Sequence, residues 1–331
     1  MNPTVLEICA GAGGQSYGLE IGGLEHVAAV EIDPDACKTL RVNRPNWHVL
    51  QQDVREIDGK QFRGIDVLAG GVPCPPFSIA GKQLGQDDER DLFPEALRLA
   101  AEIRPKVVFL ENVKGLGAPK FDSYRKAIFS RFVRLGYQVT STILNAADFG
   151  VPQLRPRFLI VATKVPSFTW PSPQQHRVTV GEALKDLMEA GGWEGAKAWA
   201  ASATDIAPTL VGGSKKHGGP DLGPTRARQK WATLGIDGRG LAELPPANDF
   251  PHSGQPRLTV RMAARIQGFG DDWHFVGRKT AAYRQVGNAF PPPVAAAVAC
   301  QIAAALGHAP GGITTHSSAS RSKPKPRASA L

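Results

Sequence analysis

Short apolar segments of strand length alternate with helix-like segments through the first half of the chain. The apolar segments cover residues 4–8, 27–31, 49–51, 65–69, 107–110, 138–144 and 157–162. Between them, residues 91–103 and 123–135 repeat apolar side chains at helical spacing. Chains that alternate strands with helices build mostly parallel sheets with helices on both faces. The sequence therefore predicts an α/β fold whose ligands bind at the carboxyl ends of the strands.

The pattern changes at about residue 166. From there to about residue 256, Gly, Pro and Trp interrupt short strand-like pieces, which predicts a second, smaller and loop-rich domain. Basic residues crowd into one stretch of that region, at Lys215, Lys216, Arg226, Arg228 and Lys230. Residues 309–331 are small, polar and basic without an acidic residue, so we expect a disordered tail that adds non-specific affinity for nucleic acid.

Charge and cysteine usage limit the class of protein. The formal net charge of +9 favours a polyanionic partner, because phosphate binding releases counterions, although a solvated basic surface is the alternative. The four cysteines are far apart and lack zinc-ligand spacing, so we expect neither a disulfide framework nor a metal. The apolar runs are far shorter than the roughly 20 residues of a membrane span, and no cleavable leader precedes the first strand. We therefore expect a soluble cytoplasmic protein without a membrane anchor.

A glycine-rich turn over residues 10–16 follows the first strand and opens a helix. Missing side chains let a nucleotide-like ligand approach the backbone, although a simple tight turn would need the same glycines. The dehydrogenase fingerprint is not met, because Ser16 stands where its third glycine would be. Glu31 closes the next strand, where a carboxylate can bind ribose hydroxyls, and Asp53 closes the third and could accept from an adenine amino group. A helix cap or a solvated loop is the alternative for these carboxylates, and Asp33 before a proline looks like a cap.

Cys74 stands between two prolines just past the end of the fourth strand. An isolated cysteine is usually an inert buried residue. Pro73 and Pro75 instead hold this thiol in a rigid extended turn at the ligand-binding edge, which suits a positioned nucleophile. Residues 79–90 are Gly-rich and polar, the composition of a loop that closes over a substrate.

Glu111 ends the following strand and so shares this edge of the sheet with Cys74. A buried structural carboxylate is the alternative, but apolar surroundings would raise its pKa and suit it to donate a proton near neutral pH. Arg155 and Arg157 occupy alternate positions of an extended segment. We therefore expect both guanidinium groups to point to one side and to hold an anion or a carbonyl oxygen.

Taken in order, these segments resemble the DNA cytosine-5 methyltransferase family over most of the chain. The resemblance rests on the glycine-rich turn, Pro73-Cys74, Glu111-Asn112-Val113, Gln153-x-Arg155-x-Arg157, residues 257–261 with 267–269, and Gln285-Val286-Gly287-Asn288-Ala289. Only residues 166–256 lack a recognisable pattern, which is where the family keeps its variable target-recognition region. The resemblance implies a Rossmann-like S-adenosylmethionine-dependent methyltransferase sheet in a catalytic cofactor-binding domain over residues 1–165. A target-recognition domain would cover residues 166–270, and a return segment over residues 271–308 would complete the catalytic domain.

The resemblance also implies the reaction. Cys74 would attack C6 of a cytosine flipped out of the duplex, while Glu111 contacts N3 and stabilises the enamine. C5 would then take the methyl group, and loss of the C5 proton with expulsion of Cys74 would leave 5-methylcytosine and S-adenosylhomocysteine. Attack at C6 is needed because C5 of the aromatic ring is a poor nucleophile until conjugation is broken. By similarity Arg157 contacts the cytosine O2, and Arg155 supports the loop or the phosphate beside it.

By similarity, Glu31 binds the ribose of the cofactor, Asp53 its adenine amino group, the glycine-rich turn its methionine end and Asn288 its carboxylate. The implied cofactor contacts are Cys9, Ala10, Gly11, Gly13, Gly14, Glu31, Ile32, Asp53, Val54, Gly71, Pro73, Asn288 and Ala289. The family commonly places an aromatic side chain at the position of Cys9 and near Ile32 to pack on adenine, and both residues are smaller here. No metal is called for.

The implied partner is double-stranded DNA, bound by a monomer in the cleft between the two domains. The candidate DNA contacts are Ser78, Gln153, Lys215, Lys216, Arg226, Arg228 and Arg239. A compact chain without an added regulatory domain looks like a bacterial modification enzyme that meets the nucleoid when bound to DNA. A cognate restriction endonuclease would act separately.

Two local departures carry further expectations. Pro75 stands where the family usually has glutamine, which removes an amide proton and changes the freedom of the loop backbone. Thr259 is expected to cap a helix over residues 260–267, but Met262 replaces the acidic partner, so the capping box is expected to be incomplete. Arg261 and Arg265 share one face of that helix, where they either meet phosphates or are solvated.

Other functions stay open. Related enzymes methylate cytosine in transfer RNA with the same catalytic parts, and the composition of residues 166–256 favours DNA without deciding. A catalytically silent nucleic-acid-binding protein would have no reason to keep Cys74, Glu111 and Arg157 together. A dehydrogenase would need a complete glycine fingerprint and a hydride-transfer site, and the sequence offers neither.

Overall fold

The computed structural model describes residues 1–73, 91–174, 176–213 and 221–311. Its centre is a seven-stranded sheet in the order β3-β2-β1-β4-β5-β7-β6. The strands are β1 (Thr4–Ile8), β2 (Glu25–Glu31), β3 (Val49–Gln51), β4 (Val67–Gly70), β5 (Val107–Val113), β6 (Gln138–Asn145) and β7 (Pro156–Thr163). Strands β1 to β5 are parallel, whereas β7 pairs antiparallel with both β5 and β6. The predicted α/β fold with a mostly parallel sheet is therefore confirmed.

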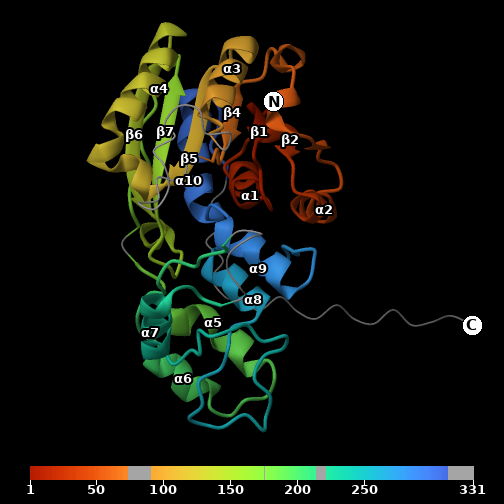
Figure 1. Ribbon diagram of the computed structural model, residues 1–331, viewed down its shortest axis with the longest axis vertical. Coiled ribbons are helices and arrows are strands. Elements are labelled where there is room, and N and C mark those ends of the chain that lie inside the picture. Colours follow the sequence, from red (N-terminus) through yellow and green to blue (C-terminus); the bar gives the residue numbers. More distant parts are fainter. Residues whose placement is uncertain (74–90, 175, 214–220, 312–331) are drawn as a thin grey trace, which may run out of the picture.

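Helices cover both faces of this sheet because its strands alternate their side chains. Leu6, Ile8 and Val108 enter the core on one face, and Val5 and Phe109 enter the core on the other. Helices α3 (Phe93–Ile103) and α4 (Asp122–Arg134) pack on the first face. Helices α1 (Gly14–Ile21) and α10 (Pro292–Ala305) pack on the second, and α2 (Pro34–Asn43) lies beside β2 and β3 (Figure 1).

Helices α1 and α10 are far apart in the sequence, yet their backbones lie in close contact. A Cβ atom at Gly18 would lie 2.4 Å from the Cβ atom of Ala295, and one at Gly22 would lie 2.3 Å from that of Ala299. Only glycine fits at these two positions. Helix α10 is apolar on nearly every side because it is buried there, but no helix in the described part of the chain is long and apolar enough to cross a membrane.

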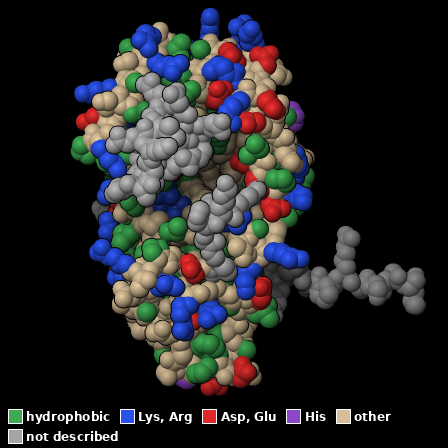
Figure 2. All heavy atoms as spheres, viewed as in Figure 1, with side chains coloured by type: hydrophobic (Ala, Val, Ile, Leu, Met, Phe, Trp, Pro, Cys, Tyr) green, Lys and Arg blue, Asp and Glu red, His purple; other side chains and the backbone are tan. Residues whose placement is uncertain are grey.

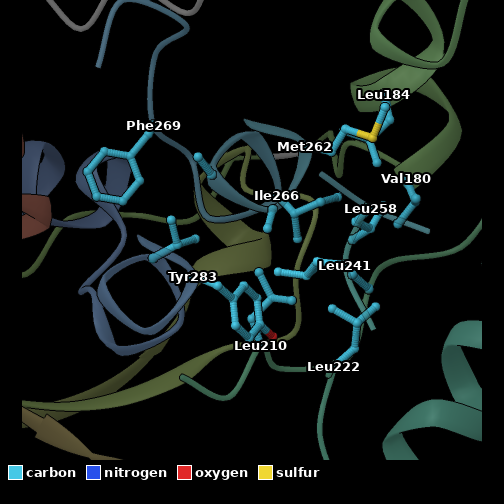
Figure 3. Close-up of a cluster of buried hydrophobic side chains, with 14 of the residues drawn as sticks. Val180, Leu184, Leu210, Leu222, Leu241, Leu258, Met262, Ile266, Phe269 and Tyr283 are labelled. Carbon is cyan, nitrogen blue, oxygen red and sulfur yellow. The ribbon is translucent and has the colours of Figure 1, made fainter. Parts of the chain in front are cut away.

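The remaining helices form a smaller part below the sheet in Figure 1. They are α5 (Val180–Glu189), α6 (Ala196–Ser202), α7 (Thr225–Thr233), α8 (Val260–Ile266) and α9 (Lys279–Asn288). The strand-like pieces expected in residues 166–256 are not strands, since the described residues there hold three helices and isolated β-bridges. One apolar cluster joins these helices, and Figure 3 shows Leu184 of α5, Ile266 of α8 and Tyr283 of α9 converging in it.

Side-chain caps set the start of two helices near the sheet edge and the cluster. Asp33 accepts hydrogen bonds from the backbone of Asp35 and Ala36 at the start of α2, as expected of a cap. Thr259 accepts from Met262 N at 3.2 Å, and Thr259 N donates to Met262 Sδ at 3.4 Å. The expectation that Met262 leaves the capping box incomplete is therefore wrong, because a thioether sulfur is also a weak acceptor.

Candidate active site

A cavity of about 240 Å³ opens at the carboxyl ends of β1, β2, β4 and β5. It lies at the point between β1 and β4 where the strand order reverses, which is the position at which open α/β sheets bind ligands. The glycine-rich turn and the first turn of α1 form one wall, and α9 forms another. Eight of the predicted cofactor contacts line it, namely Cys9, Ala10, Gly11, Gly14, Glu31, Gly71, Asn288 and Ala289.

The glycine-rich turn owes its shape to left-handed backbone and to close packing. Cys9, Gly11 and Gly13 have φ angles of 53°, 57° and 88°. A Cβ atom at Gly13 would lie 2.5 Å from the ring of Trp273, whose Nε1 donates to Ala12 O at 3.1 Å. The turn is thus held by an indole from far along the chain. Burial raises the pKa of the Cys9 thiol, and the nearby Glu31 carboxylate raises it further, so the thiol stays protonated near neutral pH.

Glu31 closes β2 at the floor of the cavity. Its carboxylate accepts hydrogen bonds from Gly11 N at 2.7 Å, Ile32 N at 2.9 Å and Asp33 N at 2.8 Å. Burial raises the pKa of Glu31, and these backbone donors oppose that rise. A carboxylate has about four acceptor positions, so Glu31 keeps capacity for a hydroxyl of a ligand.

Glu111 and Arg157 meet at the other end of the cavity. Glu111 lies on β5 and lines the cavity, and Arg157 lies on the neighbouring β7. Arg157 Nε lies 2.7 Å from Glu111 Oε1, and both side chains are nearly buried. Burial raises the pKa of Glu111, while Arg157 and Arg155 lower it. The prediction that apolar surroundings raise this pKa is therefore confirmed, and the carboxyl is held in a fixed orientation.

The predicted nucleophile Cys74 lies outside the described residues, as does the candidate DNA contact Ser78. The segment that leads to Cys74 is nevertheless placed. Asn112 Nδ2, next to Glu111, donates to Val72 O at 2.8 Å, and Leu92 N donates to Pro73 O at 3.1 Å. The chain therefore enters the undescribed segment beside Glu111.

Arg155 and Gln153 are both buried and hydrogen bonded, which for Arg155 agrees with the loop-supporting alternative of its expected role. Arg155 is 1% exposed and donates to Leu210 O, Gly287 O and Ala289 O at 2.7–2.9 Å. Gln153 is fully buried, accepting from Leu210 N and donating to Gln267 Oε1 and Ile266 O. Arg155 lies near enough to Arg157 and Glu111 for their charges to shift its pKa. Neither Arg155 nor Gln153 reaches solvent in this structure. Gln153 joins the segment before β7 to Leu210 and to the end of α8, and Arg155 joins it to Leu210 and to the end of α9.

The other predicted cofactor contacts lie outside the cavity lining. Val54 is buried in a short 3-10 helix that Asp53 caps, and Asp53 also pairs with Arg55 at 3.0 Å. Ile32 is 62% exposed and Pro73 is exposed. Gly13 is packed beneath the turn against Trp273. A contact of these residues with a cofactor stays a prediction.

Three of the candidate DNA contacts in the smaller part can be located. Arg226 is exposed on α7, and Arg228 Nη2 donates to Thr225 Oγ1 at 3.2 Å. Arg239 is exposed and pairs with Asp237 at 2.9 Å. Lys215 and Lys216 lie outside the described residues. In Figure 2, Lys and Arg side chains are spread over both the sheet-bearing part and the smaller part rather than gathered in one stripe.

Arg261 and Arg265 are partly exposed and already have partners in the protein, and a contact with phosphates stays a prediction. Arg261 donates to Gly270 O at 3.1 Å and to Trp273 O at 2.8 Å. Arg265 pairs with Asp186 and Asp271. These arginines brace the chain after α8, and within the described part of the chain their charges are already matched or hydrogen bonded.

Sequence reasoning did not assign to the site five polar side chains that line the cavity, Gln15, Asp33, Asp35, Arg284 and Gln285. Gln15 is 4% exposed, and both atoms of its amide are buried without a hydrogen-bond partner. Arg284 lies one helical turn before Asn288, so the spacing of four residues on α9 is the signal that could have revealed it. Among the residues that the structure describes, no group of His, Cys, Asp and Glu could hold a metal ion.

The sequence matches the family described as C-5 cytosine-specific DNA methylase over residues 3–304. It is 55% identical over 309 residues to the type II methyltransferase M.NaeI of Lentzea aerocolonigenes, covering 91% of this chain and 75% of the relative. It is 55% identical over 313 residues to the type II methyltransferase M.NgoMIV of Neisseria gonorrhoeae, covering 92% and 99%. The solved structure of the Entamoeba histolytica methyltransferase EhMeth shares the fold, with a TM-score of 0.66, 18% identity and coverage of 92% and 99%. The resemblance seen in the sequence is thereby confirmed, and the chain belongs to the C-5 cytosine-specific DNA methylase family.

Proposed function

We propose that this chain methylates C5 of a cytosine within a specific sequence of double-stranded DNA, as the modification enzyme of a type II restriction-modification system. Family membership supports the reaction, and the two type II relatives at 55% identity support the setting. One observation of the structure carries the proposal. The nearly buried pair of Glu111 and Arg157 lies beside the backbone that leads directly into Pro73 and Cys74.

The proposed chemistry assigns one task to each of these residues. The Cys74 sulfur adds to C6 of a flipped-out cytosine, which raises the electron density at C5. Because burial raises the pKa of Glu111, its carboxyl can share a proton with N3, and Arg157 can donate to O2. S-adenosylmethionine supplies an electrophilic methyl group to C5. Loss of the C5 proton then lets the C6–S bond break and restores Cys74.

The cavity fits the cofactor that this chemistry needs. Glu31 keeps acceptor capacity for a ribose hydroxyl, and the buried Gln15 amide lacks any hydrogen-bond partner, as expected where a polar ligand belongs. Asp53 lies close enough to Cys9 to raise the pKa of its thiol, which supports placing the adenine amino group on this side. Ile32 and Val54 are proposed to meet the adenine there, and Gly71 and Pro73 to border the methyl group.

We further propose the domain division given by the resemblance, with residues 1–165 and 271–308 as the catalytic domain and residues 166–270 as the target-recognition domain. The exposed Arg226 and the partly exposed Arg228 on α7 support a DNA-facing role for the recognition part, together with Lys215 and Lys216. The protein would act as a monomer in the bacterial cytoplasm, and a cognate endonuclease would act separately. Transfer RNA is the competing substrate, and identity to type II methyltransferases favours DNA.

The test is transfer of labelled methyl groups from S-adenosylmethionine to bacterial genomic duplex DNA and, separately, to transfer RNA. We expect label in duplex DNA and none in transfer RNA. Cys74→Ser should abolish transfer, and the matched variant Cys300→Ser should retain it, because Cys300 is buried in α10 away from the cavity lining. Label in transfer RNA alone, or full activity of Cys74→Ser, would overturn the proposal.

A further inference from the structure

Helix α9 turns one complete face toward the cavity. Ala281, Arg284, Gln285 and Asn288 all line it, and their spacing of three, four and seven residues places them on a single side of the helix. Gln285 is engaged, because its Oε1 accepts from Thr39 Oγ1 at 2.7 Å and its Nε2 donates to Val276 O at 2.7 Å. Asn288 Nδ2 donates to Gly213 O at 3.2 Å. Arg284 is therefore the long polar side chain of this face that is left to meet a ligand.

Arg284 differs from the other buried or half-buried arginines near the site. Arg155, Arg157, Arg261 and Arg265 all donate to carbonyl or carboxylate oxygens. Arg284 is half-buried, and its Nε is inaccessible to solvent and has no hydrogen-bond partner among the described residues. Arg155 Nε is also unpaired, but the two Nη atoms of Arg155 donate to carbonyl oxygens, whereas no nitrogen of the Arg284 side chain donates within the part of the chain that the structure describes. Burying a guanidinium N–H without an acceptor is unfavourable, so its position indicates an acceptor outside the described residues, such as a ligand bound in the cavity.

The charges around the cavity restrict what that acceptor is. Carboxylates of Glu31, Asp33, Asp35 and Glu111 line the cavity, and Arg284 is its one Lys or Arg among the described residues. A ligand with positive groups and a single carboxylate matches this distribution, because its cations can face the acidic residues while its anion faces α9. The amino-acid end of S-adenosylmethionine has this composition, with an ammonium, a sulfonium and one carboxylate.

We propose that Arg284 is the residue that binds the α-carboxylate of S-adenosylmethionine. The proposal rests on the proposed function and deepens it, since the resemblance assigned this carboxylate to Asn288. A guanidinium offers two parallel donors to a carboxylate, whereas the Asn288 amide already donates to Gly213 O. Arg284 would thereby hold the methionine end of the cofactor against α9.

The test measures binding without catalysis. Calorimetry in the absence of DNA compares S-adenosylhomocysteine with its decarboxylated analogue on the wild type, Arg284→Met and Arg284→Lys. The matched control is Arg278→Met, which removes an equal charge from the exposed N-cap of the same helix outside the cavity lining. Arg284→Met should lower the affinity for S-adenosylhomocysteine about tenfold or more, as expected for a lost charge-assisted hydrogen bond. It should lower the affinity for the decarboxylated analogue less than about twofold. The affinity of Arg284→Lys for S-adenosylhomocysteine should lie between those of the wild type and Arg284→Met, and the affinity of Arg278→Met should equal that of the wild type.

Equal weakening of both ligands by Arg284→Met would show a structural role and overturn the proposal. Unchanged binding of both, with weaker binding of duplex DNA, would assign Arg284 to a phosphate instead and would also overturn it. A wild type that binds neither ligand while remaining folded by circular dichroism would refute the proposed function itself. If Arg284→Met does not fold, Arg284→Lys decides the question. Its ratio of affinities for S-adenosylhomocysteine and the decarboxylated analogue should be smaller than that of the wild type, and an equal ratio would contradict the proposal.

Discussion

Replacing Arg155 by Met should destabilise the fold strongly, because this arginine joins three separate segments by hydrogen bonds to backbone carbonyls. The acceptors are Leu210 O at 2.8 Å, Gly287 O at 2.7 Å and Ala289 O at 2.9 Å, and the side chain is 1% exposed. Burial lowers the pKa of Arg155, and Arg157 lowers it further, so the neutral methionine removes an unfavourable buried charge. The three carbonyls would each lose a partner at about 1 to 1.5 kcal/mol. We expect a net loss of about 3 kcal/mol after the gain from removing the charge.

The assay is guanidinium unfolding of the wild type, Arg155→Met and Arg177→Met, followed by circular dichroism. Arg177 is a suitable control because it pairs with Asp148 at the surface, where such a pair contributes about 0 to 1 kcal/mol. Arg155→Met should unfold at a clearly lower denaturant concentration than either of the others. Equal midpoints for Arg155→Met and Arg177→Met would refute the reasoning that Arg155 is a structural tie.

Three further perturbations follow from the cavity. Burial raises the pKa of the Glu111 carboxyl, which Glu111→Gln removes. The contribution of this carboxyl to stability is present below the ordinary glutamate pKa and is lost as pH rises through the raised pKa. The stability of the wild type relative to Glu111→Gln should therefore fall as pH rises, and a pH-independent difference in unfolding free energy would contradict this. Gln15→Leu should leave the free energy of unfolding equal or higher, because the buried amide has no partner among the described residues. It should lower the affinity for S-adenosylhomocysteine severalfold in calorimetry. Unchanged affinity would remove Gln15 from the site. Trp273→Phe should also lower that affinity severalfold through the lost bond to Ala12 O. It should destabilise the fold as well, because a smaller ring leaves a cavity where the indole is fully buried. Equal affinities would show that the indole does not hold the turn.

The sheet could be predicted from the sequence because its strands are apolar, short and separated by amphipathic helices. Strands β1 and β3 have the predicted limits, and the others extend the predicted segments by a few residues or begin slightly later. The site at the carboxyl edge followed from the fold, since Glu31 ends β2 and Glu111 comes just after the last residue of β5 that pairs with the parallel β4.

Most of the errors have physical causes that no pattern in the sequence displays. The helices α5, α6 and α7 are short and separated by Gly and Pro, so their apolar spacing is too brief to stand out from loops. The burial of Arg155 and Gln153 could not be predicted, because their partners Leu210, Gln267 and Gly287 are remote in the sequence. Gln15 was missed because its significance lies in having no partner among the described residues, which only a three-dimensional structure shows, whereas the spacing of Arg284 from Asn288 was a signal that was overlooked.

The central claim is that Cys74 becomes covalently bound to the cytosine it prepares for methylation. The measurement is incubation of the protein and S-adenosylmethionine with duplex DNA in which 5-fluorocytosine replaces cytosine, followed by denaturing electrophoresis and mass spectrometry of the adduct. Fluorine at C5 cannot leave as a proton does, so the account predicts a stable protein–DNA adduct that maps to Cys74. An adduct at another residue, or none with the fluorinated duplex while ordinary duplex DNA is methylated, would contradict the account.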